Sequence, residues 1–177
     1  PKLTGIEIVN VAFTGSGAAV TALDLQDASG QTEVNITRIS QAVNAAEVGN
    51  IMTAASKLSL ANTNANNAGV AEFSYGAGVL AGLNTGNLAV SNVQIGFLNI
   101  GQNTSGIAAR GVGITGFETL TLDSTGAAAN TIGTLNMPMD TGTAGSLVIT
   151  GSANLSLGNQ VNVVNAANNA LIEAAGV

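Results

Sequence analysis

Short alternations of aliphatic and small polar residues restrict the fold of this chain more than any other feature. At residues 6–11 and 120–122, apolar side chains recur at every second position, as in a strand that buries one face. Gly, Asn, Ser and Thr separate these units, and such residues favour turns. The same unit recurs at residues 22–25, 33–36, 57–60, 98–100, 135–137, 147–149, 155–157 and 161–163.

The units return at irregular intervals of roughly 10 to 20 residues, without a rigid repeat. A turn that buries three or four aliphatic side chains gains on the order of 5–10 kcal/mol, which is less than its backbone ordering costs. A single turn therefore cannot fold alone, whereas a stack of turns can. The sequence predicts a mainly-β fold, either a β-solenoid of the parallel β-helix or β-roll type or an elongated β-sandwich. We expect residues 1–177 to form one domain, a fragment of a larger chain.

One stretch departs from the alternation. Between Ile39 and Leu58, apolar residues recur at steps of three and four in an Ala-rich run. Ser40 is a good N-cap, so this spacing predicts one short helix over residues 41–56. Gly49 opposes that helix by roughly 1 kcal/mol relative to Ala. We interpret the helix as a packing or capping insertion in the β-framework.

The composition excludes several classes of site. Only 8% of the residues are charged, and the chain contains neither His nor Cys. Ser–His–Asp and Cys–His nucleophile systems, disulfides, and imidazole or thiolate metal sites are therefore ruled out. The cations Lys2, Arg38, Lys57 and Arg110 are too few and too scattered to bind nucleic acid phosphates. No apolar run approaches the roughly 20 residues that a membrane span requires, so we expect no membrane insertion.

The chain is not expected to be an enzyme. Two pairs of carboxylates lie close in the sequence, Asp24 with Asp27 and Glu118 with Asp123. Glycoside hydrolysis needs two carboxylates that face each other across a cleft. Aromatic residues, which stack on sugars, make up only 3% of the chain. A glycine-rich stretch at 111–116 is superficially like a phosphate loop but lacks the Gly-Lys-Ser/Thr ending.

No cofactor is certain, and calcium is the candidate. Calcium takes six to eight oxygen ligands, usually from closely spaced carboxylates. Asp24, Asp27 and Asp123, together with backbone carbonyls, are the candidate ligands. The same aspartates are also explained as residues of surface turns. The Gly-rich nonapeptide that binds calcium in β-rolls is absent.

Two segments share a phrase that points to a family. Residues 3–7 and 114–118 both read as aliphatic, Thr, Gly, apolar, Glu, and each leads into an alternating strand and then a turn rich in Gly, Ala and Thr. Together with units at 31–36 and 152–158, this phrase resembles the surface-layer proteins and large surface adhesins of Gram-negative bacteria. In that group, similar phrases lie beside calcium-binding RTX repeats.

The resemblance implies a β-solenoid-like segment of a secreted, extracellular protein at the cell surface. Such proteins generally lack Cys, are acidic, leave the cell by a type I secretion route and depend on calcium. The implied partners are identical subunits in a lattice or neighbouring domains of the parent chain. This sequence departs from the group in two ways, because the RTX nonapeptides are absent and residues 168–177 carry no recognisable secretion signal.

We therefore expect a structural segment of a self-assembling surface-layer protein. Two alternatives stay open. One is an adhesin module that recognises a cell-surface glycan, for which Phe73 and Tyr75 are the neighbouring aromatic residues. The other is a parallel β-helix enzyme that acts on polysaccharides, with Asp24 and Asp27 as its acidic site.

Overall fold

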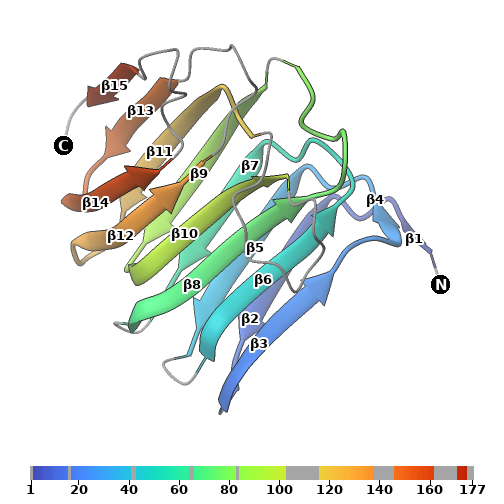
Figure 1. The fold of residues 1–177 in the computed structure, drawn as a ribbon, viewed down its shortest axis with the longest axis horizontal. Helices are drawn as coiled ribbons and strands as arrows, with labels where there is room; N and C mark the ends of the chain where they lie inside the picture. Colours follow the sequence, from blue (N-terminus) through green and yellow to red (C-terminus); the bar gives the residue numbers. More distant parts are fainter. Residues whose placement is uncertain are drawn as a thin grey trace.

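In a computed structural model, the chain forms two parallel β-sheets that face each other (Figure 1). The structure describes residues 2–15, 17–40, 43–63, 66–82, 84–102, 116–137, 146–161 and 171–174. The seven-stranded sheet contains β2 (Ile8–Phe13), β5 (Glu33–Ile39), β7 (Lys57–Ala61), β9 (Thr85–Ser91), β11 (Thr119–Thr125), β13 (Ser146–Gly151) and β15 (Leu171–Ala174). The six-stranded sheet contains β3 (Gly17–Asp24), β6 (Val43–Ile51), β8 (Asn66–Tyr75), β10 (Gln94–Gln102), β12 (Asn130–Asn136) and β14 (Leu155–Val161). Two short strands, β1 (Leu3–Thr4) and β4 (Ala28–Ser29), pair separately.

The chain passes from one sheet to the other and back, so each coil contributes one strand to each sheet. Successive coils then pair in parallel, and the strand order in both sheets follows the sequence. The two ends of the chain lie at opposite ends of the stack (Figure 1). This arrangement is a parallel β-solenoid, which confirms the first of the two folds that the sequence predicted. Residues 111–115 of the glycine-rich stretch at 111–116 lie outside the described residues.

The coil has a repeat that the sequence pattern concealed. Asn10 and Asn35 are register partners 25 positions apart, and Asn35 and Ser59 are partners 24 positions apart. One coil further along, the advance from a strand to its neighbour is longer, because Asn84 and Glu118 are 34 positions apart. Because strands of the two sheets alternate along the chain, the spacing of the aliphatic units is about half of the true repeat. Because the coils also differ in length, no constant repeat length is visible in the sequence.

The helix predicted over residues 41–56 is wrong. Residues 43–51 form β6, residues 41–42 lie outside the described range, and no helix occurs from 52 to 56. Val48 pairs with Phe73 and Ile51 pairs with Tyr75, so β6 uses three steps where β8 uses two. This β-bulge, with Asn50 at a φ of 52°, turns both Val48 and Ile51 into the core. The three-residue step from Val48 to Ile51, one of the steps that suggested a helix, is therefore produced by the bulge.

The core lies between the two sheets and consists of side-chain rows that continue from coil to coil. One row contains Val34, Leu58, Leu88 and Leu122, each directly paired with the next. Each of these side chains is at most 3% exposed. A fully buried aliphatic side chain contributes roughly 1.5–3 kcal/mol, so the rows supply the main stabilisation of the stack.

Two aromatic residues fill the space beside Gly86, which pairs with Leu120 in a neighbouring row of the core. Gly86 has no side chain, and a Cβ there would lie 2.9 Å from ring atoms of Phe117. The Phe117 ring packs edge to face against Tyr75, with 5.6 Å between the ring centroids. The Tyr75 hydroxyl donates a hydrogen bond of 2.6 Å to the backbone oxygen of Ala55. Burial raises the pKa of Tyr75 well above its ordinary value.

The Gly-apolar-Glu part of the shared phrase occupies equivalent places in two coils, while residues 114–115 lie outside the described residues. Glu7 precedes β2 and Glu118 precedes β11, both strands of the seven-stranded sheet. The backbone oxygen of Glu7 accepts hydrogen bonds from the amides of Thr32 and Glu33 in the next coil. The backbone oxygen of Glu118 likewise accepts from the amide of Ser146. The phrase therefore marks the corner at which the chain enters this sheet.

Replacing Gly133 by Ala should destabilise the stack. A Cβ at Gly133 would lie 2.7 Å from the backbone oxygen of Gly96 in the neighbouring coil, and backbone cannot rotate out of the way. We expect the free energy of unfolding in urea to fall by about 1–3 kcal/mol. The control is Thr134→Ala at the next, half-buried position of β12, which should lower it by less than about 1 kcal/mol. Equal stability of Gly133→Ala and the unsubstituted chain would contradict this close approach.

Stability should fall at alkaline pH because of Tyr75, the single tyrosine of the chain. Its pKa is raised in the folded state, so above about pH 10 the unfolded chain loses this proton first and unfolding becomes easier. The near-ultraviolet absorbance of tyrosinate should therefore appear together with the loss of β circular dichroism. Tyr75→Phe should lack this absorbance change. Tyrosinate formation near pH 10 in a chain that keeps its β spectrum would contradict the prediction.

Candidate functional site

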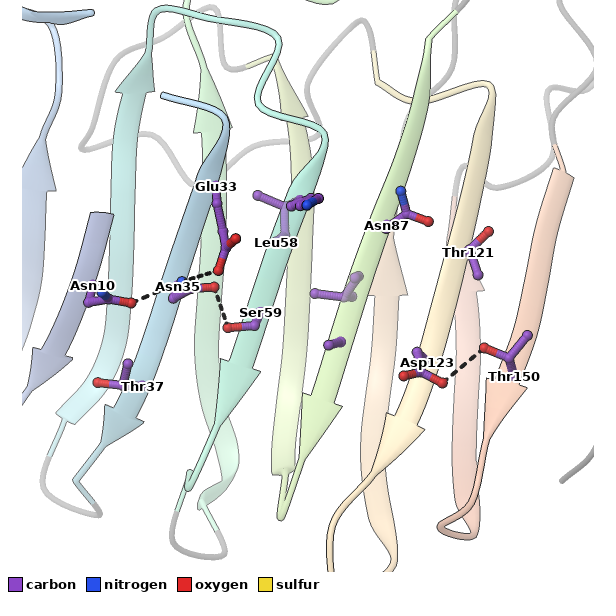
Figure 2. A pocket seen from close by; sticks show the side chains of 13 residues that line it. Asn10, Glu33, Asn35, Thr37, Leu58, Ser59, Asn87, Thr121, Asp123 and Thr150 are labelled. Atoms are coloured by element: carbon purple, nitrogen blue, oxygen red, sulfur yellow. Dashed lines mark hydrogen bonds between the residues drawn. The ribbon is translucent and has the colours of Figure 1, made fainter. Parts of the chain in front are cut away.

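A groove lies on the outer face of the seven-stranded sheet, with a volume of about 680 Å³ (Figure 2). Its lining comes from β2, β5, β7, β9, β11 and β13, so it runs across the strands and along the stack. Side chains alternate between the two faces of a strand, so the residues between buried aliphatic positions point outward. Ten of the thirteen lining residues therefore carry polar or charged side chains, and Leu58, Leu88 and Ala89 are the apolar ones.

Parallel register arranges these outward side chains in two rows. The central row is formed by Asn10, Asn35, Ser59, Ala89, Asp123 and Thr150, each the direct partner of the next. The second row is formed by Glu33, Lys57, Asn87 and Thr121. Neighbouring members of a row lie on adjacent strands, at a spacing of about 4.8 Å. The groove thus presents polar groups at regular intervals.

Hydrogen bonds hold the central row in place at both of its ends (Figure 2). The Asn35 side-chain amide donates to Asn10 Oδ1 at 2.9 Å and to Glu33 Oε1 at 2.8 Å. Ser59 Oγ donates to Asn35 Oδ1 at 2.6 Å. At the far end, Thr150 Oγ1 donates to Asp123 Oδ1 at 3.0 Å. These contacts orient the polar groups before any ligand arrives.

Ala89 separates the two hydrogen-bonded ends of the central row. It lies on β9 between Ser59 and Asp123, and its methyl group reaches neither. The small side chain leaves a gap in the middle of the groove, bordered in the second row by Asn87 and Thr121. The middle of the groove is therefore the place where a ligand group could enter most deeply.

The carboxylates of the groove are poorly placed for acid–base catalysis. Glu33 lies on β5 and Asp123 on β11, three strand positions apart, which is roughly 14 Å at 4.8 Å per strand. Paired carboxylates of glycosidases lie at most about 9.5 Å apart. Lys57 stands in the second row between them. This arrangement suits the binding of a polar ligand better than its cleavage.

The structure places Asp123 on a different sheet from Asp24, so the three candidate calcium ligands do not come from one turn. Asp24 ends β3, and its Oδ1 accepts hydrogen bonds from the amide of Gln26 at 2.9 Å and from the Asn50 side chain at 3.0 Å. Asp27 lies in the turn that follows and is exposed, while its backbone oxygen accepts from the amide of Leu3. Asp123 lies in the groove on the other sheet. Asp24 thus closes a turn, as the structural interpretation of these residues proposed.

No cluster of three or more acidic side chains that could hold a metal ion occurs among the described residues. The second carboxylate pair is also divided. Glu118 is buried at the entry to β11, where its Oε2 accepts a 2.6 Å hydrogen bond from the amide of Asn84. Asp123 of the same strand faces the groove. Calcium binding by Asp24, Asp27 or Asp123 stays a prediction.

The aromatic pair considered for a glycan site belongs to the core. Phe73 and Tyr75 are both fully buried in β8. Neither ring can stack on a sugar while the chain is folded. A ligand on this protein would instead meet the polar rows of the groove, which sequence reasoning missed. Their signal is the middle residue of triads such as Val9-Asn10-Val11 and Leu58-Ser59-Leu60, but the sequence does not say which triads share a sheet.

Two buried carboxylates lie side by side in the six-stranded sheet. Glu47 and Glu72 are register partners on β6 and β8, and both are nearly inaccessible. The Asn99 side-chain amide donates to Glu72 Oε2 at 3.3 Å. Both carboxylates lie on a different sheet from the groove and contribute nothing to its lining.

Comparison with known proteins gives no further assignment: no protein-family model, curated protein or solved structure matches the chain. Where the structure describes the chain, it contains no helix that is long and apolar enough to cross a membrane.

Replacing Asn35 by Asp should weaken the hydrogen-bonded end of the central row. Asn10 Oδ1 and Glu33 Oε1 both accept hydrogen bonds from the Asn35 amide. A carboxylate at this position has no hydrogen to donate, so it would face two other acceptor oxygens. We expect a loss of about 1–3 kcal/mol of unfolding free energy at pH 7. The repulsion raises the pKa values of the two carboxyls in the folded state, so the loss should shrink as the pH falls below about 5.

The control for this change is Asn10→Asp, which keeps the oxygen that accepts from Asn35. Urea unfolding at a series of pH values measures both variants. A loss for Asn35→Asp that is the same at pH 4 and pH 7 would mean that charge repulsion is not its cause.

Proposed function

We propose that the chain is a structural segment of a secreted, self-assembling bacterial surface-layer protein, located outside the cell at its surface. The observation that carries this proposal is the open parallel edge of the stack. At one end, β2 and β3 each have a neighbour on one side only among the strands that the structure describes, so we infer that their outer backbone groups are available for pairing.

The β2 edge lacks the devices that usually prevent such pairing. Natural edge strands are often protected by Lys or Pro, and β2 contains neither. It also leaves Ile8 53% exposed. A further coil placed against this edge would pair the backbone and bury Ile8. Identical subunits or neighbouring domains of the parent chain are the proposed source of that coil.

The rest of the molecule supports a mechanical role. A stack of parallel coils is stabilised mainly by contacts between neighbouring coils, so further coils can be added through the same kind of contact. Added coils would extend both sheets in the same direction. The resemblance to surface-layer proteins agrees with this role, and it implies calcium dependence, which we include in the proposal.

A glycan-binding module is the second candidate function, and the polar groove is the observation that favours it. The polysaccharide-cleaving alternative gains no such support, because the groove carboxylates are far apart and Asp24 caps a turn.

Assembly of the purified chain tests the proposal. We expect light scattering and negative-stain electron microscopy to show head-to-tail chains or ordered sheets, more readily with millimolar calcium. Ile8→Lys places a charge on the β2 edge and should raise the concentration needed for assembly at least about tenfold.

Phe97→Lys is the matched control. Phe97 is 47% exposed, close to the value for Ile8, but it lies on β10 inside the six-stranded sheet, away from any edge. This variant should assemble like the unsubstituted chain. A chain that stays monomeric at all concentrations, with or without calcium, would refute the proposal.

A further inference from the structure

The groove can recognise a ligand only through side chains. The backbone amides and carbonyls of β5, β7, β9 and β11 are engaged in pairing on both sides of each strand. An extended peptide usually binds by adding a strand to a free edge, and these four central strands offer none, because the open edge of β2 lies at one end of the groove. A ligand rich in hydroxyl groups has no such requirement, because amides, hydroxyls and carboxylates can all hydrogen-bond to it.

The side chains of the groove match such a ligand in chemistry. Asn87, Thr121 and Asp123 border the gap above Ala89, and they offer an amide, a hydroxyl and a carboxylate within adjacent strands. Because hydrogen bonds already orient Asn35, Ser59 and Asp123, little ordering is needed on binding.

Charge narrows the class of ligand. Glu33 and Asp123 stand on either side of Lys57, so the groove carries two negative charges and one positive charge. The whole chain has a formal net charge of −6. A polyanion would meet repulsion at both carboxylates, whereas a neutral polymer would not.

The length of the groove indicates a polymer. The central row crosses six strands from Asn10 to Thr150, which spans about 24 Å at 4.8 Å per strand. A row this long and straight exceeds what a single sugar or other small molecule would fill. It suits an extended chain that lies parallel to the axis of the stack.

We propose that the groove on the seven-stranded sheet binds a neutral, linear polysaccharide, with Ala89 as the floor of its central subsite and Asn87, Thr121 and Asp123 as hydrogen-bonding partners. The site uses an outer face, not the β2 edge, so it is independent of the assembly proposed above.

Isothermal titration calorimetry of the full chain tests this proposal. The probes are the neutral hexasaccharides cellohexaose, xylohexaose and mannohexaose, with hexagalacturonate as the anionic comparison. We expect at least one neutral hexasaccharide to bind at least about tenfold more tightly than hexagalacturonate. Assembly, measured separately, should be unchanged by Ala89→Leu, so failure of one proposal is distinguishable from failure of the other.

Two variants locate the site. Ala89→Leu fills the gap and should weaken binding at least about tenfold, while Ala22→Leu, an equally conservative change at an exposed position of β3, should leave it unchanged. Asn87→Ala shortens an exposed side chain, so it keeps the test valid if Ala89→Leu does not fold. Asn87→Ala should weaken binding severalfold.

Three results would overturn the proposal. The first is the absence of binding for all three neutral probes at millimolar concentration. The second is tighter binding of hexagalacturonate. The third is binding that neither Ala89→Leu nor Asn87→Ala reduces in a chain with an unchanged circular dichroism spectrum.

Discussion

Pairing of each coil with the next is the interaction on which the rest of this structure depends. The backbone pairs in parallel, and the same step places aliphatic side chains such as Leu58 and Leu88 directly beside each other in the core. One coil buries too few side chains to offset the ordering of its backbone. In the stack, each inner coil packs its side-chain rows against two neighbours, and this additional burial offsets the entropy lost when the backbone is ordered.

Polar residues make this stacking compatible with sharp corners. Asn130 is fully buried, yet its amide donates to Ser124 Oγ and to the backbone oxygen of Thr125, and its Oδ1 accepts from the amide of Val93. Asn62 and Asn92 adopt positive φ angles at the equivalent corner of successive coils, where β7 and β9 end. The Asn62 side chain donates to the backbone oxygen of Thr37, so Asn130 and Asn62 both satisfy backbone groups near the ends of strands.

The same register that builds the core creates the groove. An outward residue on one strand is held beside the outward residue of the next, so Asn35 meets both Asn10 and Ser59 although about 25 residues separate each pair. The chemistry of this surface is set by rows of side chains, and the small Ala89 changes the shape of the central row between Ser59 and Asp123. Residue type and spacing along the chain indicate the candidate aspartates but not the face on which each one lies, so Asp24 caps a turn whereas Asp123 lies in the groove.

The sequence by itself determined the alternation of buried and exposed positions, and with it a mainly-β fold, because period-two burial is a local property of an extended chain. It left a solenoid and a sandwich open, and the parallel pairing of the strands decided for the solenoid. The tertiary structure alone decided which strands are partners. Coil length varies between neighbouring coils, and bulges such as the one at Asn50 shift the count by one residue. The false helix over 41–56 and the undetected polar rows both follow from that, since each depends on register between residues far apart in the chain.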